Sequence, residues 1–226
     1  MKISAIIPTY NEEIHIEKAI KSVSFADEII VIDSYSTDRT VELAEKHDVK
    51  LIQRVFDDFS SQKNYAIQQA KHDWVYILDA DERVTPSLAK EILLTVKSPR
   101  DFVGFYIYRT FYFFNKKIRF GGWQRDRVVR LFLKEYCQYD GNLVHEVIKT
   151  EAKLGYLNHK LEHFSYRGFD HYISKLNQYS GLQAQQLHSK GKKVTLFHLL
   201  VKPPARFLIH YVIKLGFLDG FSGFVL

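Results

Sequence analysis

Over the first hundred residues, short apolar runs alternate with stretches in which apolar residues recur every three or four positions. The apolar runs have the length of buried strands and fall at residues 3–7, 28–33, 49–53 and 74–78. The stretches between them predict amphipathic helices, and Thr85 and Pro86 supply an N-cap and a first-turn proline for one more. Strand–helix units of this size predict a mainly parallel sheet with helices on both faces.

Polar residues follow three of the predicted strands. They are residues 8–12 after the first strand, Asp33 at the end of the second, and Asp79 and Asp81 after the fourth. Asn11, in the first of these clusters, is expected to cap the helix that follows it. Sheets of this kind bind ligands outside the carboxyl ends of their strands. We therefore expect the three polar clusters to converge in one site.

Beyond residue 100 the pattern changes to aromatic and β-branched runs, which predict strands at 102–114 and 128–133 and short strands over 143–161. Residues 169–187 predict a helix. Residues 194–226 are strongly apolar, are broken by two prolines and carry scattered lysines and arginines. This composition fits either an interfacial helix on a membrane or helices packed on the sheet or on a partner. The chain stops on an apolar run, which leaves open that it is a fragment of a longer protein.

Composition and charge narrow the class of protein. The single cysteine, Cys137, excludes an internal disulfide framework, and the first residues lack a signal-peptide pattern. No apolar run of about 18 residues is present to span a bilayer. Residues 1–100 hold 13 Lys and Arg against 17 Asp and Glu, whereas residues 101–226 hold 19 against 9. The basic second part indicates an acidic partner such as phosphate, anionic lipid or nucleic acid.

The Asp79-Ala80-Asp81 sequence has the chemistry of a divalent-cation site. Two carboxylates that leave a strand together suit Mg²⁺ or Mn²⁺, which prefer oxygen ligands and complete their shell with water and substrate phosphates. The alternative is that they are turn and capping residues. Asp33 can bind a base or ribose or cap the next helix, and Lys63 can contact phosphate or lie exposed. The chain contains neither a P-loop nor a G-x-G-x-x-G pattern, which argues against an ATPase or a dinucleotide-dependent enzyme.

Four stretches match a known family in the order in which they occur: AIIPTYNEE (5–13), VIDSYSTDRT (31–40), SQKNYAIQQA (61–70) and ILDADERV (77–84). Together they resemble the family 2 glycosyltransferases, which have the GT-A fold. GGWQRDRVVRLF (121–132) and GNLVHEVI (141–148) resemble the bacterial lipopolysaccharide core β-glucosyltransferases of that family. In this subgroup a proline often precedes the aspartate of the Gly-Gly-Trp loop. Here Gln124 and Arg125 precede Asp126, so the acceptor loop is expected to differ from that pattern.

The resemblance implies a Rossmann-like GT-A domain over residues 1–165, with a donor-binding half at 1–100 and an acceptor half at 101–165. A basic, apolar helical extension would follow at 166–226. By the same resemblance, the residues that bind the nucleotide-sugar would be Pro8, Thr9, Tyr10, Glu12, Asp33, Lys63 and Asp79. Asp33 would lie at the uracil, and Asp79 would face the ribose or the sugar. Asp81 would be the principal ligand of a Mg²⁺ or Mn²⁺ ion.

Family 2 enzymes invert the configuration at the anomeric carbon, so the resemblance implies that an acceptor hydroxyl attacks directly with the help of a general base. Glu146 and Asp126 are the two candidates for this base. Glu146 is preferred because it ends an apolar stretch after the donor half, although it can also be a surface glutamate paired with an arginine. His145 is expected either to join the metal site or to be a structural histidine.

The expected function is the metal-dependent, inverting transfer of a hexose, glucose, from a UDP-sugar to a lipopolysaccharide or lipooligosaccharide core acceptor. The enzyme would act in the cytoplasm, held peripherally on the anionic inner face of the inner membrane. A polyprenyl phosphate or another surface glycan is the alternative acceptor. A basic nucleic-acid-binding module is less favoured, because it does not explain the carboxylates at the strand ends.

Overall fold

The computed structural model covers residues 1–226 and describes all of them except residues 142–146 and 167. The chain forms two compact units. The first contains residues 1–109 and 127–163, and the second contains residues 110–126 and 164–226. These units are defined by compactness. The predicted division into a donor half (1–100), an acceptor half (101–165) and an extension (166–226) concerns function and stays a prediction.

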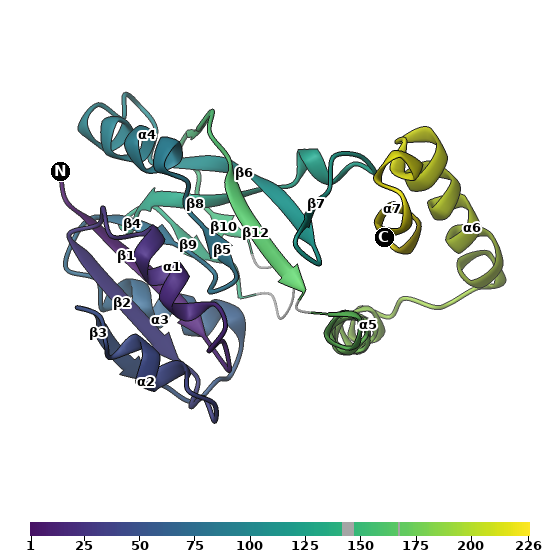
Figure 1. Cartoon of the computed structure of the whole chain (residues 1–226), viewed down its shortest axis with the longest axis horizontal. Coiled ribbons are helices and arrows are strands. Elements are labelled where there is room, and N and C mark those ends of the chain that lie inside the picture. The colour runs from purple at the N-terminus through teal and green to yellow at the C-terminus, as the bar shows by residue number, and fades with distance from the viewer. Residues whose placement is uncertain (142–146, 167) are drawn as a thin grey trace. The chain divides into compact units, whose positions relative to one another are not determined.

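The first unit is built on a mixed sheet. Its strands follow in the order β3 (Lys50–Gln53), β2 (Glu28–Asp33), β1 (Ile3–Thr9), β4 (Trp74–Ile77), β8 (Arg127–Leu133) and β6 (Gly104–Phe113) (Figure 1). The first four run parallel to one another, and β8 is antiparallel to both of its neighbours. Three further pairings use β11 (Leu154–Tyr156) beside β6, β5 (Glu82–Arg83) with β12 (Leu161–Tyr166), and β9 (Gln138–Tyr139) with β10 (Ile148–Lys149).

Helices cover both faces of the parallel strands. They are α1 (Ile16–Ser22), α2 (Thr40–Ala44), α3 (Phe59–Gln68) and α4 (Pro86–Lys97). Successive residues of a strand point to opposite sides, so Ala5 and Ile7 of β1 join a core with α1, α2 and α4, whereas Ile6 joins a core with α3. The predicted mainly parallel sheet with helices on both faces is confirmed. The antiparallel position of β8 between β4 and β6 was not predicted.

The second unit is mostly helical. Its elements are β7 (Lys116–Lys117), η1 (Trp123–Arg125), α5 (Phe169–Ser189), η2 (Phe197–Val201), α6 (Lys202–Phe207), η3 (Leu208–Ile213), η4 (Gly216–Asp219) and α7 (Phe221–Val225). A small core of Phe111, Phe113, Ile118 and Tyr172, three of them aromatic, lies within it. The predicted C-terminal helical extension is therefore confirmed.

The C-terminal segment, defined as residues 194–226, is anchored within this unit to the loop at residues 119–122. The Asp219 carboxylate accepts the backbone N–H groups of Arg119 and Phe120, and the N–H of Gly121 donates to the carbonyl of Lys214 at 2.9 Å. Most of its large apolar side chains nevertheless stay exposed. Across the part of the chain that the structure describes, no helix combines the length and the apolar content that crossing a bilayer requires.

Candidate functional site

The three polar clusters meet at one edge of the sheet, as predicted. β1 lies between β2 and β4, and Thr9 at its carboxyl end pairs directly with Asp33. On the other side, the N–H of Leu78 donates to the carbonyl of Ile6 at 2.9 Å, which brings the turn at residues 79–81 beside β1. We call this edge the strand-end site.

Hydrogen bonds join the loop after β1 to the loop after β2. Asn11 Oδ1 accepts the N–H of Thr37 at 2.8 Å, and the N–H of Asn11 donates to Ser36 Oγ at 2.8 Å. Asn11 has a φ of 53°, in the left-handed region that asparagine tolerates better than most residues. The expected N-cap role of Asn11 is wrong, since α1 begins only after His15 and Asn11 bridges the two loops instead.

Asp33 is fully buried, and its carboxylate holds the loop after β2. It accepts hydrogen bonds from the N–H of Ser36 at 2.9 Å, from Ser36 Oγ at 2.5 Å and from Gln53 Nε2 at 3.2 Å. The carboxylate therefore shapes the loop that lies beside Asn11. Its expected contact with a uracil stays a prediction.

The other residues expected around the nucleotide lie on or next to these loops. Thr9 is buried, Pro8 and Glu12 are partly buried, and Tyr10 is 57% exposed. Tyr35, on the loop after β2, was not selected from the sequence, yet its ring is 52% exposed and its φ is 59°. Exposed rings on two connected loops are suited to stacking on a planar base, because every base has an aromatic face.

A cluster of ion pairs surrounds the carboxylate of Asp79. Arg130 Nη2 donates to Asp79 Oδ2 and, at 2.6 Å, to Glu82 Oε1. Lys63 Nζ lies 3.2 Å from Asp79 Oδ1, and Arg109 Nη1 lies 3.4 Å from Glu82 Oε1. Lys63 is buried, so it is not an exposed lysine. Desolvation alone would raise the pKa of Asp79, but the charges of Arg130 and Lys63 outweigh it and hold that pKa well below its usual value.

A bulge in β8 places Arg130 in this cluster. The pairing of β6 with β8 passes from Phe105↔Leu131 directly to Tyr106↔Val129, so Arg130 is the extra residue. A bulge breaks the alternation of side chains along a strand and re-aims one of them. Arg130 can therefore reach the carboxylates at the end of β4 while the residues on either side of it continue the sheet.

Asp81 faces a histidine that the sequence analysis did not select. Asp81 Oδ2 lies 3.5 Å from Nε2 of His163, and the two side chains are 14% and 16% exposed. His163 lies on β12 and pairs across the strands with Glu82 of β5. No motif connects these positions in the sequence, because only the tertiary pairing of β5 with β12 brings them together.

Asp81 and His163 together have the donor types of a divalent-cation site. A carboxylate oxygen suits Mg²⁺ and Mn²⁺, and an imidazole nitrogen is a common ligand of divalent transition-metal ions. Within the described ranges, no three Asp, Glu, His or Cys side chains gather into a metal-binding group. Asp81 and His163 therefore fit a site in which substrate oxygens and water complete the coordination shell.

Of the two candidates for the general base, Asp126 is among the described residues. Asp126 follows η1 in the second unit, is partly buried, and donates its N–H to the carbonyl of Trp123 at 3.3 Å. Glu146 and His145 lie outside the described residues. Both base candidates, and the choice between the ligand and structural roles of His145, stay predictions.

Comparison with known proteins gives a family model and relatives that span the chain. The model described as "Glycosyl transferase family 2" matches residues 4–150. A Rickettsia bellii protein described as an uncharacterized glycosyltransferase is 30% identical, over 99% of this chain and 80% of its own. The lipopolysaccharide core biosynthesis glycosyltransferase LpsC of Rhizobium meliloti is 29% identical, over 100% of this chain and 86% of its own.

Among solved structures, the crystal structure of TarS residues 1–349 from Staphylococcus aureus is 26% identical to this chain. The match covers 50% of this chain and 36% of that one, with a TM-score of 0.40.

Removing the Arg130 guanidinium tests the ion-pair cluster. Arg130→Leu leaves Glu82 buried with a weaker partner, and should lower the free energy of unfolding at pH 7 by roughly 3–5 kcal/mol. The pKa of Asp79 is depressed in the folded state, so this stabilisation is present above the unfolded pKa of about 3.9 and is lost as pH falls through and below it. Urea unfolding at pH 7 and at about pH 2.5 should therefore show a smaller difference between variant and wild type at the lower pH.

Arg39→Leu is the matched control, because the Arg39–Glu42 pair is exposed. Its unfolding midpoint should stay close to that of the wild type. Equal effects of the two substitutions would contradict a stabilising role for the Arg130 cluster.

Proposed function

The chain belongs to glycosyl transferase family 2, and we propose that it transfers a hexose, glucose, from a UDP-sugar to a lipopolysaccharide or lipooligosaccharide core acceptor. The observation that carries this proposal is the strand-end site, where Asp81 and His163 lie next to the Asp79–Arg130 pair. The relationship to LpsC supports the class of acceptor. In this proposal residues 1–100 bind the donor, residues 101–165 receive the acceptor, and residues 166–226 extend the domain.

The nucleotide lies across the ends of β1, β2 and β4 in this proposal. Pro8, Thr9 and Glu12 line its pocket, Tyr10 packs on the base, and Asp33 reads the uracil. The exposed ring of Tyr10 and the fixed loop around Asp33 support this assignment. A loop that is already held in place does not have to be ordered when the ligand binds, which lowers the cost of binding.

Asp79 and Lys63 serve the ribose and the phosphates. The Asp79 carboxylate is kept ionised by Arg130 and Lys63, so it is an acceptor for hydroxyl groups over the whole physiological pH range. Lys63 Nζ, buried beside it, contributes a positive charge next to the diphosphate. Ion pairs fix the positions of both side chains, which keeps them oriented for the donor.

Asp81 and His163 hold a Mg²⁺ or Mn²⁺ ion in this proposal, with His145 as a further candidate ligand. Such an ion, when bound, neutralises negative charge on the departing UDP. His163 is kept in reach of Asp81 by the pairing of β12 with β5. The 3.5 Å separation of Asp81 Oδ2 and His163 Nε2 supports their action on one ion.

Inversion requires that the acceptor hydroxyl attack from the face opposite the diphosphate while a base removes its proton. Glu146 is the base we propose, and Asp126 is the alternative. A sugar hydroxyl is too weak an acid to ionise at neutral pH, so the proton must leave as the new bond forms. The base therefore has to lie within about 2.6–3.2 Å of that hydroxyl.

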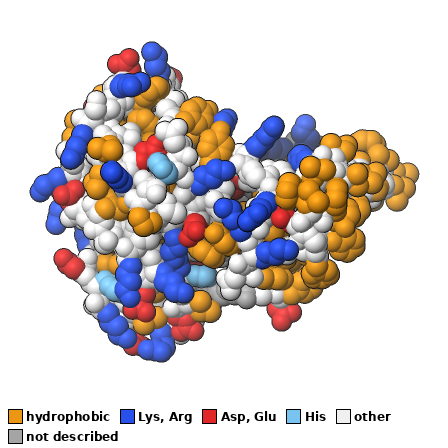
Figure 2. Space-filling view, turned by 45° about the horizontal axis from the view of Figure 1, so that its top comes forward, with side chains coloured by type: hydrophobic (Ala, Val, Ile, Leu, Met, Phe, Trp, Pro, Cys, Tyr) orange, Lys and Arg blue, Asp and Glu red, His pale blue; other side chains and the backbone are white. Residues whose placement is uncertain are grey.

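The C-terminal segment supports a membrane-bound acceptor and a peripheral position on the cytoplasmic side of the inner membrane. Figure 2 shows hydrophobic side chains gathered over this segment, and Leu200, Ile213 and Phe221 are 68%, 72% and 74% exposed. Lys202 and Arg206 belong to the same segment and are also exposed. Apolar side chains beside cations are the features by which an interfacial helix binds anionic lipid. The same features favour polyprenyl phosphate as the second candidate acceptor.

Metal-dependent donor binding tests the core of the proposal. Calorimetry should detect UDP binding that requires Mn²⁺ or Mg²⁺, and Asp81→Asn and His163→Ala should each weaken it at least tenfold, or about 1.4 kcal/mol. His159→Ala is the control, because this nearby exposed histidine pairs with Glu91 instead. If Asp81→Asn keeps the metal-dependent affinity of the wild type, the metal assignment is wrong. If none of a panel of UDP-sugars is bound or consumed, the transferase proposal itself fails.

Two isosteric substitutions separate the candidates for the base. Glu146→Gln should lower kcat by about 10²–10⁴-fold with UDP affinity nearly unchanged, because it removes basicity and keeps the shape. Asp126→Asn should change kcat far less. The measurement is sugar transfer, or hydrolysis of the UDP-sugar, at saturating donor. The reverse result would assign the base to Asp126.

Vesicle sedimentation tests the membrane proposal. The wild type should bind vesicles that contain phosphatidylglycerol, and binding should weaken with salt. Lys202→Glu should weaken it about fivefold or more, since one basic residue near an anionic surface contributes about 1 kcal/mol. Leu200→Asp should weaken it at all salt concentrations, and Lys18→Glu on α1 should have little effect. If the wild-type protein does not sediment with such vesicles at low salt, the membrane proposal is contradicted.

A further inference from the structure

Three tyrosines and two cations form a cluster on the first unit, outside the strand-end site. Tyr156 stacks on Tyr106 with ring centroids 5.2 Å apart, and Tyr108 lies near-parallel to Tyr156 at 6.4 Å. The guanidinium of Arg127 lies 5.2 Å from the centroids of both Tyr106 and Tyr156. Lys160 Nζ lies 5.9 Å from the centroid of Tyr108. We call these five residues the tyrosine surface.

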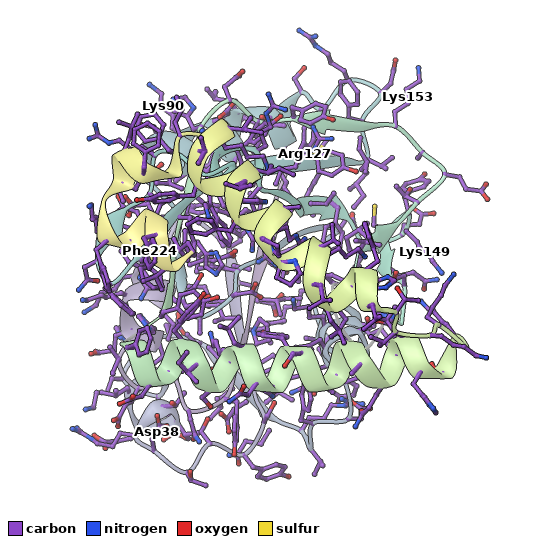
Figure 3. All side chains as sticks on the ribbon, turned by 90° about the vertical axis from the view of Figure 1, so that its right-hand side faces the viewer. Asp38, Lys90, Arg127, Lys149, Lys153 and Phe224 are labelled. Carbon is purple, nitrogen blue, oxygen red and sulfur yellow. The ribbon has the colours of Figure 1, made fainter. Side chains whose placement is uncertain are left out.

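The strand registers explain why these side chains share one face. Tyr156 of β11 pairs with Tyr106 of β6, and Arg127 of β8 pairs with Tyr108 of β6. Alternate residues of β6, such as Ile107, point to the opposite face and are buried in the core. The tyrosine surface itself is accessible, because Arg127 (Figure 3) and Lys160 are exposed and Tyr156 is 52% exposed.

The charge of this surface differs from that of the strand-end site. Arg130, three residues along β8, pairs with two carboxylates. Among the residues that the structure describes, Arg127 and Lys160 make no ion pair with a carboxylate. The polar partner of Arg127 is the hydroxyl of Tyr108, at 3.4 Å. A guanidinium held against aromatic rings is pre-oriented, and its planar N–H edge matches phosphate and carboxylate groups.

We propose that the tyrosine surface binds an oligosaccharide acceptor that carries an anionic group, with sugar rings on the tyrosine faces and the phosphate or carboxylate at Arg127. The proposal rests on the glycosyltransferase function and names the chemical class of its acceptor. The apolar C–H faces of sugar rings pack on exposed aromatic side chains, whose hydroxyl groups add hydrogen bonds.

The position along β8 sets the scale of this contact. Arg127 is three residues from Arg130, and a strand rises about 3.3 Å per residue, so the two lie about 10 Å apart along β8. Arg130 contacts Asp79 at the strand-end site. The anionic group of the acceptor would therefore lie about the length of a disaccharide from the donor residues, and not on the reacting sugar itself.

Three forms of one trisaccharide test the proposal. The probes are maltotriose, maltotriose with a terminal phosphate, and maltotriose oxidised to a terminal carboxylate, with inorganic phosphate as a fourth ligand. NMR titration of the full chain should show that at least one charged form binds about fivefold or more tightly than the neutral form. Preference for one charged form would identify the anion as phosphate or as carboxylate.

Variants assign the effect to the surface. Arg127→Gln should abolish the preference for the charged form, and Tyr156→Ala should weaken the binding of all three trisaccharides. Lys153→Gln is the control, because this exposed lysine directly precedes β11 and is not part of the tyrosine surface. Thermal unfolding of each variant checks that the fold is unchanged.

Three results would overturn the proposal: no binding of any trisaccharide, equal binding of charged and neutral forms, or inorganic phosphate bound as tightly as the phosphorylated trisaccharide. UDP binding by the same variants is measured in parallel. If the wild type does not bind UDP, the proposed function is contradicted. If the wild type binds UDP but does not prefer a charged trisaccharide, only the proposal for the tyrosine surface is contradicted.

Discussion

A single guanidinium fixes the two carboxylates on which the strand-end site depends. Removing Arg130 and Glu82 from water carries a large desolvation cost, which their contact offsets only when the surrounding fold holds a favourable geometry. The bulge in β8 supplies that geometry by directing Arg130 toward the end of β4. The result is an ionised Asp79 at the edge of the sheet. Asp81 and His163 follow from the same arrangement, because β5 and β12 pair at Glu82.

The sequence predicts the parallel part of the fold because its signal is local. Four apolar runs separated by helical stretches are sufficient for the sheet, and strand ends of a parallel sheet share one edge. The pairing of Thr9 with Asp33 confirms that inference at residue level. The start of α4 is also predicted correctly from the sequence. Thr85 is its N-cap, and Thr85 Oγ1 accepts the N–H of Leu88 at 3.2 Å. In each case the prediction needed only neighbouring residues.

The parts that escaped prediction all depend on contacts between distant residues. Nothing near Arg130 in the sequence signals a bulge, and nothing near His163 signals that β12 will pair with β5. Asn11 looked like a helix cap because its side chain is suited to capping, yet the same carbonyl oxygen serves the loop after β2 equally well. The sequence therefore identifies Asn11 as a side chain that accepts a backbone hydrogen bond. The tertiary structure determines that the donor is the N–H of Thr37 and not an N–H of α1.

The second unit connects two features that the sequence presents separately. Asp219 accepts two backbone N–H groups of the loop at residues 119–122, and His210 Nδ1 lies 2.9 Å from the carbonyl of Gly121. That loop leads directly into η1 and Asp126. The C-terminal segment, most of whose large apolar side chains are exposed, is thus hydrogen-bonded to the loop that leads to one candidate base. Breaking these partly buried hydrogen bonds would leave polar groups without partners, so displacement of the segment and displacement of the loop are coupled. The exposed apolar segment and the loop that leads to Asp126 are therefore joined by hydrogen bonds into one structural element.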